Sequence, residues 1–189
     1  MVGIGFIYPM FKAMVEGHKT QTSRMGSRKY HVGQRLYVKE PTVLWGYPGA
    51  FPDDKDVIYQ WYDCKFTGVS YLWDGQTAPT ETFWKQYNKM FMPAGAARHI
   101  IEITNVETKR LGDFDADDYR REGMKEHMAM QLVPGERPTS EWRVDLANDS
   151  CFAREDPAEV FRYILKLTAG KDIYDPEMSP TVYQFKLVK

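Results

Sequence analysis

The sequence predicts an α+β fold, because segments with the period of a strand and segments with the end signals of a helix both occur. Residues 32–40, 97–110 and 181–188 alternate apolar and polar side chains, as half-buried strands do. Three further segments start at a proline or directly after an aspartate and end near glycine, as amphipathic helices do: residues 9–16, 116–123 and 157–170. A chain of 189 residues is long enough for one hydrophobic core, so we expect a single domain.

The N-terminal segment predicts a short strand followed by a helix. Residues 2–8 are apolar and β-prone, and Pro9 suits the first turn of a helix, where its missing N–H costs nothing. Gly17 follows the helix and can adopt the left-handed conformation that ends one. Residues 1–40 carry seven basic residues against two acidic ones, which supports an anionic ligand or, equally well, a solvated basic face.

Residues 17–24, Gly-His-Lys-Thr-Gln-Thr-Ser-Arg, form the segment richest in reactive groups. Lys19 and Arg24 can hold an anion or polarise a carbonyl, and Thr22 offers a hydroxyl as nucleophile or donor. In a plain strand Lys19 and Thr22 would point to opposite faces, so a site that uses both requires a turn or an irregularity. A polar surface turn is the alternative interpretation of the same residues.

Two segments with weak periodicity predict loop-rich insertions, at residues 42–95 and 126–153. The first holds 13 aromatic residues, which either stack on nucleic-acid bases or pack as hydrophobic anchors. Within it, residues 57–66 and 68–73 are candidate strands and residues 81–87 a candidate short helix.

The helix predicted from residue 116 has Asp115 as its N-cap and ends at Gly123, which places Glu122 at its C-terminus. The helix dipole there disfavours a charged carboxylate, so Glu122 should take up a proton more readily, as proton transfer requires. A frayed, solvated glutamate is the alternative. We expect a solvent-accessible side chain, and a change in the free energy of unfolding of less than about 1 kcal/mol for Glu122→Gln.

Composition and motifs argue against several classes of protein. The net charge of −1 does not suit a general polyanion binder. Cys64 and Cys151 stand apart, and the four histidines form no i, i+4 pair, so we expect neither a disulfide framework nor a metal site. No phosphate-binding or dinucleotide motif occurs, and no cofactor is expected. Without an apolar run of membrane-spanning length or a basic leader, we expect a cytoplasmic protein with no membrane partner.

Several segments, in this order, resemble the ASCH-domain family of the PUA-like superfamily, especially its phage-encoded members. The matching segments are Pro9-Met10, residues 17–24, residues 32–41, Met92-Pro93, residues 100–110, Arg121-Glu122-Gly123-Met124, residues 156–161 and residues 182–188. The resemblance covers most of the chain outside residues 126–153 and parts of the aromatic region. Two features depart from the phage pattern: Ser23 stands where arginine is frequent, and no Asn-Pro-Trp precedes residue 181.

The resemblance implies a PUA-like mixed β-barrel with flanking helices, and binding of RNA or modified nucleobases. It also implies a specific chemistry, because a small bacterial branch hydrolyses N4-acetylcytidine to cytidine and acetate. The active residues of that branch match Lys19, Thr22 and Glu122. Thr22 would attack the amide, Lys19 would activate the hydroxyl or stabilise the oxyanion, and Glu122 would carry the proton to the leaving amine.

We therefore expect a nucleoside or RNA base to bind in a cleft near these three residues, with Arg24, Lys39 and Glu40 as nucleotide-binding residues. Hydrolysis of an N4-acylcytidine is the most specific form of this hypothesis. The first alternative is a non-catalytic reader of RNA or modified bases. The second is a phage accessory factor that binds a host protein through residues 126–153.

Overall fold

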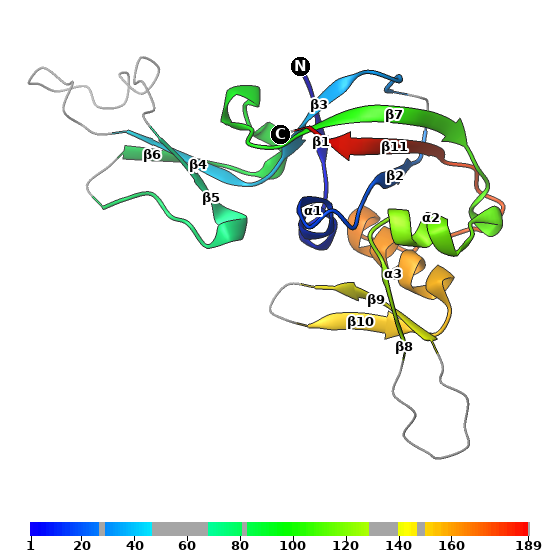
Figure 1. Cartoon of the computed structure of the whole chain (residues 1–189). Coiled ribbons are helices and arrows are strands. Elements are labelled where there is room, and N and C mark those ends of the chain that lie inside the picture. Colours follow the sequence, from blue (N-terminus) through cyan, green and yellow to red (C-terminus); the bar gives the residue numbers. More distant parts are fainter. Residues whose placement is uncertain (27–28, 47–67, 81–82, 129–139, 147–149, 189) are drawn as a thin grey trace, which may run out of the picture. The chain divides into compact units, whose positions relative to one another are not determined.

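Two units make up the part of the chain that the computed structural model describes, namely residues 1–26, 29–46, 68–80, 83–128, 140–146 and 150–188 (Figure 1). The first unit consists of Met1–Gly5 and Tyr37–Arg98, and the second of Phe6–Leu36 and His99–Lys189. Helices and antiparallel strands both occur, which confirms the α+β class.

The largest sheet is curled and has five strands in the order β1-β3-β7-β11-β2. Their bounds are β1 (Val2–Gly5), β2 (Gln21–Arg24), β3 (Arg35–Lys39), β7 (Ile100–Thr108) and β11 (Thr181–Leu187). Strands β7, β11 and β2 belong wholly to the second unit, and β11 runs antiparallel to both of its neighbours. β11 is thus the strand against which β2 is aligned.

The pairing of β7 with β11 contains an irregularity next to Asn105. Gln184 lies opposite Asn105, whereas the next residue, Phe185, lies opposite Ile103. One residue of β7, Thr104, is therefore left over, as in a β-bulge. The bulge lets Ile103 and Val106, three positions apart, pair with Phe185 and Tyr183, which are two positions apart.

The first unit contains a three-stranded antiparallel sheet in the order β5-β4-β6. Its strands are β4 (Thr42–Gly46), β5 (Gly68–Tyr71) and β6 (Phe83–Tyr87), and single-turn helices span Leu72–Asp74, Lys89–Phe91 and Ala94–Ala96. Leu44, Met92 and Ala96 form its buried cluster.

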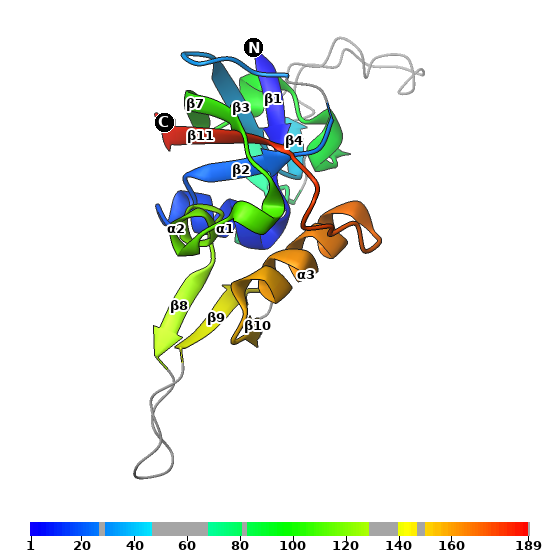
Figure 2. The ribbon, with the colours of Figure 1, turned by 90° about the vertical axis from the view of Figure 1, so that its right-hand side faces the viewer.

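The second unit places three helices with the strands β7, β11 and β2, and adds a second small sheet (Figure 2). The helices are α1 (Tyr8–Val15), α2 (Ala116–Arg121) and α3 (Pro157–Ala169), and Leu111–Asp113 forms a single turn. The small sheet has the order β10-β9-β8, from β8 (Lys125–Met128), β9 (Ser140–Asp145) and β10 (Cys151–Arg154).

Aromatic side chains join α2, α3 and β9 inside the second unit. Tyr119 of α2 lies 6.0 Å from Phe161 of α3 and 6.2 Å from Trp142 of β9, measured between ring centroids. Phe114, which precedes α2, lies 5.8 Å from Phe161. Because all four rings are buried, this cluster fixes α2 by a large apolar contact area.

The end signals of the helices are confirmed. Asp115 and Asp118 form a reciprocal capping box at the start of α2, and Asp156 accepts a hydrogen bond from the N–H of Ala158 at the start of α3. Gly170 ends α3 in the left-handed conformation with φ of 73°. Gly17 and Gly123 follow α1 and α2 with φ of 79° and 100°. Strands β7 and β11 also lie where the alternating pattern predicts them.

Two predictions of local structure are wrong. The helix expected at residues 81–87 is the strand β6 over Phe83–Tyr87, because this aromatic-rich segment pairs along β4. The loop expected at residues 126–153 includes strands β9 and β10 and most of β8; Trp142 and Val144 of β9 are buried alternately. The strand expected at residues 57–66 lies outside the described residues.

Among the helices that the structure describes, none has the length and apolar character needed to cross a membrane.

Gly123, which follows α2, lies close to Lys19, and its replacement tests this close approach. A Cβ atom there would lie 3.0 Å from Ala13 Cβ and 3.1 Å from Lys19 Cβ, at a backbone φ of 100°. We expect Gly123→Ala to lower the free energy of unfolding by about 2 to 4 kcal/mol, from backbone strain and overpacking together. Chemical denaturation measures this.

Gly170→Ala is the matched control, because it has a positive φ of 73° but no atom within 4 Å of the added Cβ. It should cost only the backbone term, about 1 to 2 kcal/mol. Equal losses for the two variants would contradict the close approach of Gly123 to Lys19.

Candidate active site

A buried ion pair joins Lys19 to Glu122, two residues 103 positions apart in the sequence. Lys19 Nζ lies 2.7 Å from Glu122 Oε2 and also donates to the backbone oxygen of Glu122 at 2.8 Å. The exposed fractions of the two residues are 2% and 3%. The structure therefore brings together two of the three catalytic residues that the resemblance implies.

Backbone hydrogen bonds explain why these two residues meet. After α1 ends at Val15, the N–H of Lys19 donates to the carbonyl of Ala13 at 2.9 Å, which folds the chain back on the helix. The N–H of Thr20 then donates to the carbonyl of Arg121 at 2.9 Å, and Lys19 and Glu122 form an isolated antiparallel bridge. The ends of α1 and α2 thus fix both sides of the ion pair.

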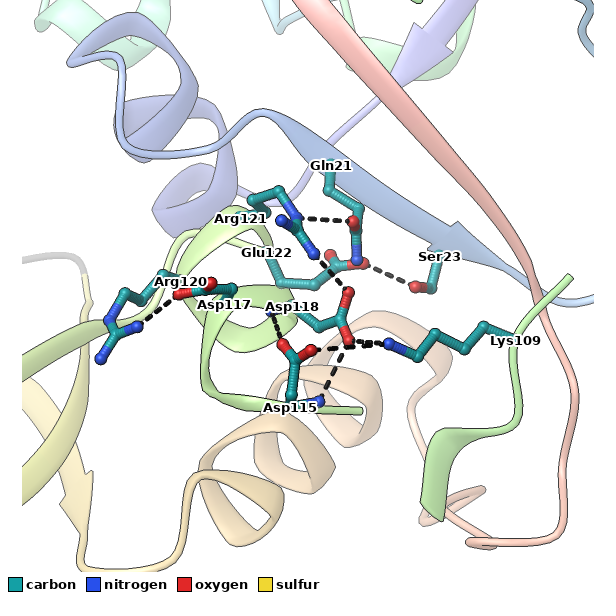
Figure 3. Close-up of polar contacts among 9 residues, drawn as sticks. All are labelled: Gln21, Ser23, Lys109, Asp115, Asp117, Asp118, Arg120, Arg121 and Glu122. Atoms are coloured by element: carbon teal, nitrogen blue, oxygen red, sulfur yellow. Dashed lines mark hydrogen bonds and ion pairs between the residues drawn. The ribbon is translucent and has the colours of Figure 1, made fainter. Parts of the chain in front are cut away.

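Ser23 completes the set of partners of the Glu122 carboxylate. Its Oγ donates a hydrogen bond to Glu122 Oε1 at 2.6 Å (Figure 3). Lys19 bonds to Oε2, so each carboxylate oxygen accepts from a different side chain. Glu122 is buried and paired, so the expectation of a solvent-accessible carboxylate is wrong. Glu122 is buried because residues 19–23 fold back alongside α2, and the helix pattern by itself does not reveal this contact.

Strand alternation separates Thr22 from the Glu122 carboxylate. On either side of it in β2, Gln21 accepts a hydrogen bond from Arg121 Nε at 3.2 Å and Ser23 contacts Glu122 (Figure 3). Gln21 and Ser23 thus face α2, and Thr22 points to the other face of the strand. Thr22 is 4% exposed and lies opposite Tyr183 of β11.

Arg24 lies at the end of β2, among aromatic side chains. The centre of its guanidinium is 5.6 Å from the Phe6 ring centroid, and Lys19 Nζ is 5.9 Å from the same ring. Tyr30 and Tyr183 form an edge-to-face pair with centroids 5.1 Å apart, and the N–H of Lys29 donates to the Tyr183 hydroxyl. Lys19, which pairs with Glu122, and Arg24 therefore lie near the same ring, that of Phe6.

The surroundings change the proton affinities of these groups. Burial lowers the pKa of the Lys19 ammonium, the charge and hydrogen bond of Glu122 oppose this change, and the positive charge of Arg24 adds to it. Burial also lowers the pKa of Arg24 and raises the pKa of the Tyr30 hydroxyl. Burial has the largest effect, so the pKa of Lys19 lies below its ordinary value although Glu122 opposes the change.

A second charged network holds α2 beside β2. Asp118, almost fully buried, accepts hydrogen bonds from Lys109 and from Arg121, the latter at 2.8 Å (Figure 3). Burial by itself would raise the pKa of Asp118, but the hydrogen bonds from Lys109, Arg121 and the N–H of Asp115 lower it. Since Arg121 also bonds to Gln21, this network fixes the helix end that carries Glu122.

Glu40 and Lys39, expected as nucleotide-binding residues, belong to the first unit, whereas Lys19, Thr22, Arg24 and Glu122 belong to the second. Glu40 has an exposed fraction of 0%, and its two carboxylate oxygens accept hydrogen bonds from Arg98 at 2.9 and 2.7 Å. Arg98 also binds Asp74, and its guanidinium centre lies 4.0 Å from the Tyr71 ring centroid. Lys39 Nζ donates to the backbone oxygen of Met90 at 3.1 Å. This geometry favours a structural role for Glu40.

Ser23 is the site residue that the sequence analysis does not select. A signal for it exists, since residues 19, 21 and 23 share one parity and would share a face in an extended segment. The described residues contain no group of three or more histidine, cysteine, aspartate or glutamate side chains that could hold a metal ion. Cys151 is an exposed free thiol.

No protein-family model, no curated protein and no solved structure matches this chain.

Because Glu122 is buried, its replacement should lower the free energy of unfolding more than the sequence analysis expects. Glu122→Gln leaves the buried Lys19 without a charged partner, and breaking a buried pair in this way costs about 3 to 5 kcal/mol. We therefore expect a clear fall in the denaturation midpoint, measured by urea titration.

Glu126→Gln is the control for this experiment. Glu126 pairs with Arg120 at the surface, so its replacement should cost less than about 1 kcal/mol. The double variant Lys19→Met, Glu122→Gln should recover part of the loss, because it removes both charges. A midpoint of Glu122→Gln equal to that of Glu126→Gln would contradict the buried pair.

The role of Glu40 is testable in the same way. Glu40→Gln breaks the two-point contact with Arg98 and should lower the free energy of unfolding by about 3 kcal/mol. In the protein that remains folded, nucleoside affinity should change less than about twofold, which corresponds to about 0.4 kcal/mol. Glu102→Gln, at a surface pair with Arg35, is the control. A large loss of affinity with unchanged stability would assign Glu40 to ligand binding.

Proposed function

We propose that this protein recognises a nucleoside or an RNA base and hydrolyses an N4-acylated cytidine, of which N4-acetylcytidine is the simplest, to cytidine and carboxylate. The observation that carries the proposal is the ion pair between Lys19 and Glu122, which meet from distant parts of the sequence. The same two positions match active residues in the resemblance to the ASCH family. The curled sheet with helices is compatible with a PUA-like barrel.

The chemistry requires a hydroxyl, a base and a cation, and all three side-chain types lie together here. Glu122 receives a proton from the attacking hydroxyl and returns it to the departing N4 amine. Lys19 orients the carboxylate, since its ammonium contacts both the side chain and the backbone of Glu122. In the family branch that this chain resembles, the hydroxyl belongs to the residue that matches Thr22.

Arg24 and the rings near it support recognition of the base or of a phosphate. A guanidinium can bond to phosphate or stack on a planar base, and aromatic rings add stacking area. Arg24 beside Phe6, with Tyr30 and Tyr183 nearby, also supports the alternative function of a reader that binds modified bases without cleaving them.

Acetate release from N4-acetylcytidine by the purified protein tests the catalytic proposal. We expect turnover by the wild type, and a loss of about a hundredfold or more in Glu122→Gln, the usual scale for a general acid or base. The rate should be measured at a temperature where circular dichroism shows the variant folded. Glu126→Gln is the control and should keep the wild-type rate.

A wild type that releases no acetate, and no carboxylate from longer N4-acylcytidines, would refute the catalytic proposal. Titration of N4-acetylcytidine and of short RNA carrying it then decides whether the protein is a reader. Binding that weakens in Arg24→Gln would support a reader that uses this cluster.

A further inference from the structure

We propose that Ser23, rather than Thr22, provides the hydroxyl that attacks the acyl group. This inference rests on the proposed function, and it deepens it by assigning the nucleophile and the acylated intermediate.

The first support is the contact between Ser23 and the base. An activated nucleophile lies within about 2.6 to 3.2 Å of its base, and a third group orients the base. Ser23 Oγ is 2.6 Å from Glu122 Oε1, and Lys19 Nζ is 2.7 Å from Glu122 Oε2. Serine, glutamate and lysine thus stand in the order nucleophile, base and orienting group.

The second support is the orientation of β2. Thr22 lies on the face of the strand opposite to Ser23, because adjacent residues of a strand alternate. For Thr22 to reach the Glu122 carboxylate, β2 would have to rotate or slip by one residue and break its register with β11. Ser23 needs no such change.

The third support is access. Ser23 is half-buried, whereas Thr22, Lys19 and Glu122 are almost fully buried. An acyl group that comes from the solvent therefore reaches Ser23 before it reaches Lys19 or Glu122. The deeper pair then takes up the proton without itself meeting the solvent.

Donors for the developing oxyanion occur on the same face of β2. The Nε2 of Gln21 is buried and has no hydrogen-bond acceptor among the described residues, although a buried donor is rarely left without one. Lys19 has three N–H groups, of which two bond to Glu122. An oxygen of the substrate would satisfy these donors.

The reaction proceeds by two acyl transfers that balance with one water molecule. Ser23 Oγ forms a bond to the acyl carbon, and its proton passes to Glu122. The bond from the acyl carbon to N4 breaks as Glu122 returns the proton to N4, which leaves cytidine and an acyl ester on Ser23. Water attacks the ester carbon while Glu122 takes one of its protons. The bond from Ser23 Oγ to the acyl carbon then breaks, Glu122 returns the proton to Ser23 Oγ, and the carboxylic acid leaves.

Trapping and substitution together test this assignment. The wild type is treated with p-nitrophenyl acetate and quenched in acid, and fragment mass spectra locate the acetyl group on the peptide that contains residues 22 and 23. We expect the acetyl group on Ser23. In parallel, Ser23→Ala should slow hydrolysis of N4-acetylcytidine by at least about a hundredfold, Ser23→Thr should retain part of the rate, and Thr22→Val should reduce it less than about fivefold.

The outcomes separate this inference from the proposed function. Acetate release that survives Ser23→Ala, or an acetyl group found on Thr22, overturns the assignment of Ser23 and leaves the hydrolase in place. Acetylation of Ser23 without turnover of any N4-acylcytidine supports a reactive Ser23 but refutes the substrate. If Ser23→Ala does not fold, the variant Ser23→Cys decides. An acetyl ester on Thr22 of its labelled peptide overturns the assignment, and an acetyl thioester at position 23 supports it.

Discussion

The cost of burying a charge governs the arrangement of the second unit. An ammonium or a carboxylate taken out of water loses several kilocalories per mole of hydration, which only a partner at contact distance and further hydrogen bonds can return. Lys19 and Glu122 meet these conditions for each other, with Ser23 on the remaining carboxylate oxygen. The end of α1, the end of α2 and strand β2 must therefore lie together, since displacement of any of them leaves a buried charge unpaired.

This constraint also explains why the pair can serve chemistry. A surface ion pair exchanges with water and holds no fixed geometry, whereas a buried pair held by backbone hydrogen bonds keeps its orientation. The backbone of Lys19 bonds to Ala13, and the backbone of Thr20 bonds to Arg121. The Asp118 network holds the same turn of α2 through Lys109 and Arg121. The carboxylate thus keeps one orientation, as the proposed reaction requires.

Local signals in the sequence predict much of the fold. The capping residues Asp115 and Asp156 and the glycines after each helix mark α2 and α3, because these signals act within a few residues. The predictions of a helix at residues 81–87 and of a loop at residues 126–153 are wrong because contacts distant in the sequence decide the structure of these segments. Strands β6, β8 and β9 are stabilised by pairing with segments elsewhere, and a short window does not contain the partner.

The residues of the candidate site also differ in whether the local sequence predicts them. Lys19 and Glu122 are selected by residue type and by resemblance, and the structure places them in contact. The solvent exposure expected of Glu122 is wrong, because the helix alone does not show which segment covers its end. Ser23 escapes selection because its role depends on the face of β2 that meets α2, and the register with β11 decides that face. Glu40 is the opposite case. It lies in a segment that resembles the family, yet both oxygens of its carboxylate accept hydrogen bonds from Arg98.

The place of β11 in the sheet has a consequence for synthesis of the protein. β2 is an edge strand whose neighbour in the five-stranded order is β11, yet about 160 residues separate the two strands along the chain. While a ribosome is still making residues 25–180, β2 has no strand to pair with in this order, and its unpaired backbone groups are open to association with other chains. Until Thr181–Leu187 emerges, the contacts that can hold the segment with Lys19 and Ser23 are therefore those with the ends of α1 and α2.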